Sequence, residues 1–207
     1  GVYKDKFKNT NPNKNILNNF NINQNDPILL NVNRQEYRKN LDYLIYEIVK
    51  VKKIIPNIRL FMIGIGSQHD HLKLLARNFN LESNIIFLGQ VEDVSKWYKV
   101  ADYFVFPTKQ EGFGQVILEA MASGLPSILF KNVKGFTQVP FEEFITNNYN
   151  GMLVDPREEC SFSKCIIKLF SNKDLQKTLS ENCIDEIDKF FDWSVTANNL
   201  INCAISH

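Results

Sequence analysis

The segment PTKQEGFGQVILEAM contains two glutamates and a pair of glycines whose types and spacing are suited to binding a ligand. Glu111 and Glu119 lie eight positions apart, and Gly112-Phe113-Gly114 is expected to open a helix. Backbone N–H groups at a helix start bind anions, and glycine lets a phosphate approach closely. A continuous helix would separate the two carboxylates by about 12 Å along its axis. That span suits a ligand with hydroxyls at both ends and a diphosphate between them.

The two carboxylates have a functional and a structural interpretation. Carboxylates accept charge-assisted hydrogen bonds from sugar hydroxyls, each contributing about 1.5–3 kcal/mol. Alternatively, Glu111 favours the dipole of a helix start and Glu119 lies on a solvated face. The apolar surroundings of Glu119, in the sequence VILEAMA, oppose the structural interpretation. Both residues are therefore candidates for ligand binding.

Positive charge is supplied by Arg34 and Lys39, which flank the turn after the first expected strand. Arginine presents a planar fork to phosphate oxygens, and lysine presents a point charge. Two surface cations at a helix start are the alternative, but the helix dipole disfavours cations there. The chain contains no Asp-x-Asp, the common means of holding a metal-bridged diphosphate. We therefore expect side-chain cations, and no metal, to balance the charge of a diphosphate.

Two other motifs are weaker. The Gly-Ile-Gly sequence at 64–66 follows a strand and precedes a helix, but the third glycine of a dinucleotide-binding GxGxxG is missing. NAD binding is therefore not supported, although such a turn lets a ligand approach the backbone. The His-Asp-His sequence at 69–71 is not expected to hold a metal, because helix neighbours two positions apart do not share a face.

Six apolar runs of strand length must position these loops, at 28–33, 58–63, 85–88, 103–106, 127–130 and 152–154. Between them, apolar residues recur at helical spacing, and after residue 157 only helical patterns remain. Strands that alternate with helices indicate an α/β fold, a Rossmann-like doubly wound parallel sheet of about six strands flanked by helices. Ligands of such sheets bind beyond the carboxyl ends of the strands, where the loops described above lie.

Composition excludes several classes of protein. The 207 residues carry a net charge of +1, which gives no indication of binding to nucleic acid. The four cysteines form no CxxC pair, so we expect free thiols in a reducing compartment. An apolar run of about 18 residues, as a membrane helix needs, is absent. We therefore expect a cytoplasmic protein.

The segment EGFGQVILEAMASGLPSI resembles the E-x7-E signature of retaining GT-B glycosyltransferases of the family 4 type, also called glycosyl transferases group 1. NVNRQEYRKNLD is similar to the family's diphosphate-binding segment, and FMIGIGS and IIFLGQV resemble its next two strand-end loops. The resemblance extends over nearly the whole chain from residue 27. Two departures are Asn40, where a glycine often follows the lysine, and the stretch 131–143, which is longer than the usual Gly-Gly loop.

This resemblance implies catalytic roles for Arg34, Lys39 and Glu111. The two cations would bind the diphosphate and stabilise it as it leaves. Glu111, together with the amides of Gly112, Phe113 and Gly114, would hold the transferred sugar and phosphate. The family transfers the sugar with retention of configuration and needs neither metal nor cofactor.

The remaining implied contacts are with the nucleotide. Glu119 would bind the ribose hydroxyls, the backbone near Gln90 and Val91 would face the base, and Gly66 would lie near the nucleotide. The expected donor is a UDP- or GDP-linked sugar, with ADP also open, and the acceptor is a glycan or lipid.

The resemblance also divides the chain. Residues 1–26 would be the remnant of an interdomain linker, 27–190 the nucleotide-sugar-binding domain in the C-terminal half of a GT-B fold, and 191–207 the crossover helix. The acceptor-binding N-terminal domain would be missing, so the chain alone is expected to be inactive. The full enzyme could associate peripherally with the cytoplasmic membrane face. The alternatives are a non-catalytic nucleotide-binding module of the same fold and an NDP-sugar epimerase.

Overall fold

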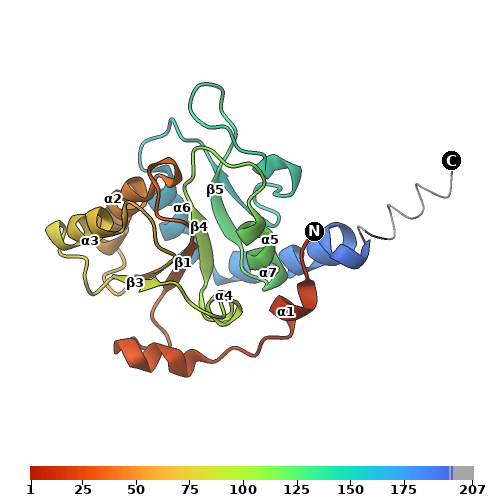
Figure 1. The fold of residues 1–207 in the computed structure, drawn as a ribbon, viewed down its shortest axis with the longest axis horizontal. Helices are drawn as coiled ribbons and strands as arrows, with labels where there is room; N and C mark the ends of the chain where they lie inside the picture. The colour runs from red at the N-terminus through yellow and green to blue at the C-terminus, as the bar shows by residue number, and fades with distance from the viewer. Residues whose placement is uncertain (196, 198–207) are drawn as a thin grey trace.

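A six-stranded parallel sheet with the order β3-β2-β1-β4-β5-β6 forms the centre of the computed structural model, which describes residues 1–195 and 197 (Figure 1). Each apolar run of the sequence forms one strand, and its bounds differ from expectation by one residue at most. The strands are β1 (Ile28–Val32), β2 (Arg59–Ile63), β3 (Ile85–Gly89), β4 (Tyr103–Phe106), β5 (Ser127–Phe130) and β6 (Gly151–Val154). The expected Rossmann-like doubly wound sheet is confirmed.

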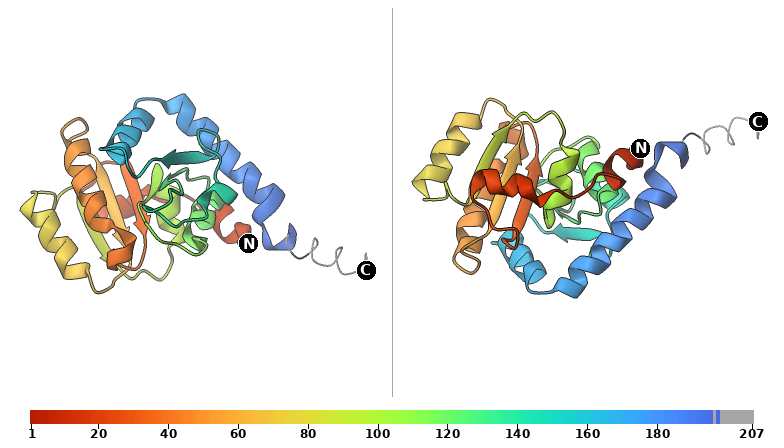
Figure 2. Two further views of the ribbon diagram at one scale, coloured as in Figure 1. Left: turned by 90° about the horizontal axis from the view of Figure 1, so that it is seen from above. Right: turned by 90° about the horizontal axis from the view of Figure 1, so that it is seen from below.

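Helices cover both faces of the sheet, which is why the strands are apolar on both sides (Figure 2). One face packs against α2, α3 and α6, and the other packs against α4, α5 and the N-terminal segment. The last long helix, α7, contacts both α5 and α6. The α-helices are α1 (Lys4–Lys8), α2 (Leu41–Lys52), α3 (His69–Asn78), α4 (Ser95–Val100), α5 (Gln115–Ala122), α6 (Ser161–Phe170) and α7 (Lys173–Glu186). Short 3-10 helices are η1 (Lys14–Phe20), η2 (Tyr37–Lys39) and η3 (Phe141–Glu143), and η4 (Ile187–Phe191) is a π-helix.

Residues 1–26 pack along the sheet in spite of their weak apolar periodicity. Four of their side chains are buried in the core beneath α4 and α5, namely Val2, Phe7, Leu17 and Ile22. The segment is also joined to the other end of the chain, because the amide of Val2 donates to the carbonyl of Phe191 at 2.8 Å. Lys4 and Lys8 both pair with Asp188. The assignment of 1–26 to an interdomain linker stays a prediction, and most of the expected crossover helix 191–207 lies outside the described residues.

The order of the strands creates a switch point between β1 and β4. Strand β1 pairs with β2 over five residues but with β4 over two, Leu29 with Tyr103 and Leu30 with Phe104. At the next position the buried side chain of Asn31 donates from Nδ2 to the carbonyl of Val105 at 2.7 Å, in place of a ladder bond. The chain segments leaving β1 and β4 diverge beyond this point, and ligands of open α/β sheets bind in such a crevice.

Gly64, directly after β2, allows the loops beside this crevice to pack closely. Its φ is +113°, and a Cβ there would overlap the carbonyl oxygen of Asn33. We expect Gly64→Ala to lower the free energy of unfolding by more than about 3 kcal/mol, because backbone would have to move. Gly89→Ala is the matched control, since Gly89 also has a positive φ of +68° but no atom within 4 Å of the added Cβ. It should cost about 1 kcal/mol. Equal losses in urea unfolding would contradict the steric explanation.

Candidate functional site

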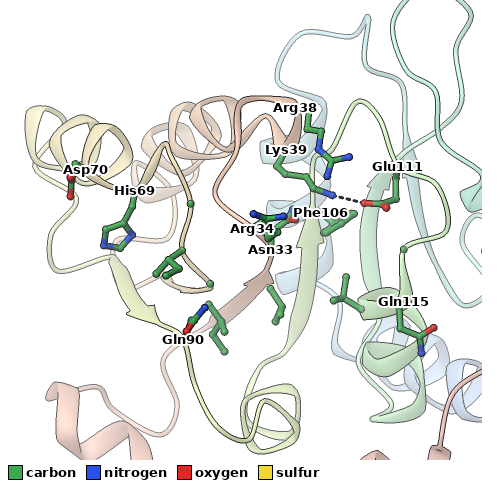
Figure 3. Close-up of a pocket in the computed structure, with 17 residues that line it drawn as sticks. Asn33, Arg34, Arg38, Lys39, His69, Asp70, Gln90, Phe106, Glu111 and Gln115 are labelled. Atoms are coloured by element: carbon green, nitrogen blue, oxygen red, sulfur yellow. Dashed lines mark hydrogen bonds and ion pairs between the residues drawn. The ribbon is translucent and has the colours of Figure 1, made fainter.

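A cleft of about 1000 Å³ lies at the carboxyl edge of the sheet (Figure 3). Loops after β1, β2, β3 and β4 and the start of α5 form its walls. Six of the residues predicted from the sequence line this cleft, namely Arg34, Lys39, Gly66, Gln90, Glu111 and Gly114. The fold therefore brings together residues from four separate loops.

An ion pair joins two of these residues across the cleft (Figure 3). The Lys39 Nζ lies 2.6 Å from the Glu111 Oε2, and the two side chains are only 7% and 17% exposed. The same ammonium group lies 5.4 Å from the centre of the Phe106 ring, a favourable cation–π position. From the sequence, the lysine and the glutamate are expected to make separate contacts with a ligand. In the structure they form one pair, so an anion that approached Lys39 would have to displace the carboxylate or share the lysine with it.

The loop that carries Lys39 is held against the loop after β4. Asn40 adopts the left-handed conformation, with φ of +55°, and its Nδ2 donates to the carbonyl of Pro107 at 3.2 Å. Asparagine tolerates this conformation better than most residues. Asn40 can therefore occupy the position after the lysine, where glycosyl transferases of group 1 often have glycine. The amide of Lys109 donates to the carbonyl of Arg38 at 3.4 Å, and the Thr108 hydroxyl lies 3.3 Å from the same oxygen and 3.0 Å from the carbonyl oxygen of Gln110. These bonds fix Lys39 opposite Glu111.

Two arginines stand at the rim of the cleft. Arg34 and Arg38 are 77% and 51% exposed, and both contact the carboxylate of Glu36, at 3.2 and 3.3 Å. Exposed ion pairs contribute less than about 1 kcal/mol, so either guanidinium can turn toward an anion at little cost. Arg38 is not among the residues predicted from the sequence, although its position beside Lys39, in a loop at the ligand edge, indicates it.

Asn33 and His69 are further cleft residues that the sequence did not indicate. Asn33 is buried, and its Nδ2 has no hydrogen-bond partner among the described residues. A buried donor without a partner is costly, so an acceptor from a ligand would stabilise it. The His69 Nδ1 lies 2.7 Å from the Gln35 Oε1, and the Gln35 Nε2 donates to the carbonyl of Gly64 at 2.8 Å. The loops after β1 and β2 are thereby joined.

The segment after Glu111 agrees with expectation only in part. Residues 112–114 were expected to open a helix, and α5 begins at Gln115, after Gly114 in the left-handed conformation with φ of +79°. The expected helix start is therefore confirmed to within one residue, with Gly114 as its N-cap, and the left-handed backbone of Gly114 keeps residues 111–113 outside the helix. The span of a continuous helix from Glu111 to Glu119 therefore does not apply. Gly112 is exposed, and Phe113 is 43% exposed and packs near Phe144, with 6.1 Å between the ring centres.

The long stretch 131–143 supports the Glu111 loop. The amide of Glu111 donates to the carbonyl of Gln138 at 3.1 Å, and the amide of Gln138 donates to the carbonyl of Lys109 at 2.7 Å. The stretch is itself closed by Thr137, whose hydroxyl donates to the carbonyl of Lys131 at 2.8 Å. The stretch 131–143, which is longer than the usual loop of the family, thus forms backbone hydrogen bonds that orient Glu111.

Glu119 and Val91 are two predicted residues that do not line the cleft. Glu119 is half-buried, one helical turn beyond the cleft residues Gln115 and Val116, and its Oε2 accepts a hydrogen bond from the Tyr98 hydroxyl at 3.1 Å. Burial raises the pKa of Glu119, and the hydrogen bond from Tyr98 opposes this rise. Val91 is partly buried against the core.

The described residues contain no group of three or more His, Cys, Asp or Glu side chains that could hold a metal ion. Cys160, Cys165 and Cys183 are free thiols. No helix in the described part of the chain is long and apolar enough to cross a membrane.

The fold and the cleft define a Rossmann-like α/β domain of the GT-B type, with cations and carboxylates gathered at its switch point. Residues 12–185 match the model of the family described as glycosyl transferases group 1. The chain belongs to this glycosyltransferase family.

Similar proteins agree with this assignment. An uncharacterised glycosyltransferase of Methanocaldococcus jannaschii is 28% identical over 87% of the chain and 45% of its own length. The C-terminal domain of the group 1 protein LpcC from Francisella tularensis has a TM-score of 0.77 and 24% identity, covering 93% of this chain and 100% of that domain. Anabaena HepE, determined in complex with UDP, has a TM-score of 0.84 and 21% identity, covering 100% of this chain and 56% of HepE. The chain spans about half the length of these curated relatives.

The ion pair predicts opposite effects of its two members on anion binding. Glu111→Gln should bind inorganic pyrophosphate more tightly, on the order of tenfold, because it removes a negative charge and frees Lys39. Lys39→Met should weaken binding by a similar factor. Calorimetry at low ionic strength is the measurement, since salt screens these charges. Glu82→Gln, an exposed position outside this cleft, is the control for net charge. Weaker binding by Glu111→Gln would show that the carboxylate does not compete for the lysine.

Proposed function

We propose that this chain is the donor-binding, C-terminal half of a retaining glycosyltransferase. It binds a UDP- or GDP-linked sugar without a metal ion, and a separate N-terminal domain binds the glycan or lipid acceptor. Arg34, Lys39 and Glu111 take part in the transfer of a hexose. Gly66, Gln90, Val91, Gly112, Phe113, Gly114 and Glu119 contact the nucleotide sugar.

The observation that carries the proposal is the cleft at the switch point, with three cations facing a carboxylate. Arg34, Arg38 and Lys39 line one wall, and Glu111 lies opposite them (Figure 3). A diphosphate gains negative charge as it leaves a sugar, and cations already in place stabilise that charge without reorganisation. Glu111 provides an acceptor for the hydroxyls of the transferred sugar on the same side of the pocket.

The comparisons support the proposed division of the enzyme. The fold covers the whole of the C-terminal domain of LpcC, and the chain spans about half of its curated relatives. HepE, which shares the fold, was determined with UDP, and UDP is therefore the first nucleotide to test.

The chain alone should bind a nucleoside diphosphate in the micromolar-to-millimolar range, with no need for a divalent ion. Side-chain cations balance the diphosphate, and the described residues offer no metal-binding cluster. Titration calorimetry with UDP, GDP and ADP, first with EDTA and then with Mg²⁺, measures both parts of this prediction. Strict dependence on Mg²⁺, or no binding of any of the three, would contradict the proposal.

Arg34→Ala should weaken UDP binding by about tenfold or more, the value of a lost charge-assisted hydrogen bond, and leave uridine binding unchanged. The reason is that Arg34 faces the phosphates and not the nucleoside. Arg77→Ala is the control, because Arg77 is an exposed arginine of α3 outside the cleft. If UDP and uridine lose equal affinity in Arg34→Ala, the arginine does not contact the phosphates.

Sugar transfer should require the acceptor domain. In labelled UDP-sugar assays with acceptor extracts, we expect the chain alone to stay far below an ordinary enzymatic rate of about 1 per second. Joining it to the proposed N-terminal domain should restore transfer. The physical reason is that the acceptor and the shielding of the sugar from water come from the second domain. Ordinary turnover by this chain alone would show that it is a complete enzyme.

A further inference from the structure

A buried tyrosine outside the predicted set contacts Glu119. Tyr98 lies on α4 and is 1% exposed. Its hydroxyl is 3.1 Å from the Glu119 Oε2 and 3.2 Å from the carbonyl oxygen of Val116. A phenol has one proton to donate, so these two acceptors compete for it. When Glu119 is ionised, it is the stronger acceptor, because it carries the charge.

The ring of Tyr98 is held in place by aromatic neighbours. Phe7 of α1 packs edge-on at 5.9 Å between ring centres, and Phe104 of β4 lies at 5.8 Å. Burial raises the pKa of Tyr98 well above its usual value, so the phenol remains a donor. The hydroxyl is therefore a fixed hydrogen-bond donor pointed at a carboxylate.

Glu119 lies close to the cleft without being fully exposed to water. Gln115 and Val116, four and three positions earlier on α5, line the cleft, so Glu119 lies on the same side of the helix. The positive charge of Lys6 on α1 also favours the ionised form of Glu119, as the hydrogen bond from Tyr98 does. Lys99 of α4 is directed to the carbonyl of Ser123 at the end of α5. Tyr98 is thus the only group shown to donate a hydrogen bond to this carboxylate among the described residues.

We propose that Tyr98 is a positioning residue for nucleotide binding, which holds the Glu119 carboxylate ionised and oriented so that its free oxygen accepts the ribose hydroxyls. This inference rests on the proposed function. Without the phenol, burial would favour the neutral acid, which accepts hydrogen bonds less strongly. The side chain would also lose the contact that fixes its orientation. Tyr98 does not touch the ligand and acts only through Glu119.

The test compares Tyr98→Phe with Tyr103→Phe. Both changes remove one buried hydroxyl and keep the ring, but Tyr103 donates to the carbonyl of Leu169 on the other face of the sheet. Carboxyl ¹³C NMR of the ligand-free chain, with the Glu119 signal assigned through Glu119→Gln, gives the pKa of Glu119. Calorimetry from pH 5 to 8 gives the affinity for UDP and for its 2′,3′-dideoxy analogue. The analogue lacks the two hydroxyls that Glu119 would bind.

Tyr98→Phe should raise the pKa of Glu119, because the bond that opposes the effect of burial is gone. The loss of UDP affinity on acidification should then occur at higher pH than in the unaltered chain. At pH 7 UDP should bind about fivefold more weakly, the value of one hydrogen bond, whereas the dideoxy analogue should be unaffected. Tyr103→Phe should match the unaltered chain in all three measurements.

Failure of the positioning role of Tyr98 can be distinguished from failure of the proposed donor binding. If the unaltered chain binds UDP but Tyr98→Phe has the same Glu119 pKa and the same preference for UDP over the dideoxy analogue, the positioning role is overturned. Equal weakening of UDP and of its analogue would also overturn it, because that result indicates general damage to the cleft. If the unaltered chain binds no nucleoside diphosphate, the proposed function fails and the inference fails with it.

Discussion

The ion pair of Lys39 and Glu111 is the interaction on which the cleft depends. It joins the loop after β1 to the loop after β4 at the position where the two strands diverge. Both side chains are largely removed from water, so each charge stabilises the other. The same two groups are proposed to bind the donor. A donor bound as proposed would therefore rearrange the contact that joins the two loops.

The geometry around this pair is set by hydrogen bonds to main-chain groups. The side chain of Asn40 donates to the carbonyl of Pro107, and the backbone of Gln138 bridges Lys109 and Glu111. These contacts hold the two loops without using the side chains that face the cleft. The loops can be rigid while the charged groups of Lys39 and Glu111 remain available to a ligand, because other atoms form the contacts between the loops. The stretch 131–143 is thus part of the support of the cleft.

The two glutamates of the signature have different surroundings. Glu111 is in a loop and faces a lysine, whereas Glu119 is in a helix and faces a phenol. A lysine neutralises a carboxylate, but a phenol leaves the negative charge in place and only stabilises it. Glu111 is therefore paired with an opposite charge, whereas half-buried Glu119 is paired with a neutral donor. This difference agrees with proposed contacts to a diphosphate sugar for the first and to neutral ribose hydroxyls for the second.

The sequence by itself determined the sheet and the set of loops that meet at its edge. Runs such as ILLNV and YFVF are typical of strands covered on both faces, because they are short, largely apolar and alternate with helical patterns. The tertiary structure alone decided which side chains meet. Lys39 and Glu111 are 72 positions apart, and their distance follows from the packing of two loops. The start of α5 at Gln115 depends on the left-handed backbone of Gly114, and glycine is compatible with either conformation, so its identity could not reveal the choice. The Tyr98 contact with Glu119 depends on how α4 packs beside α5, which local periodicity does not specify.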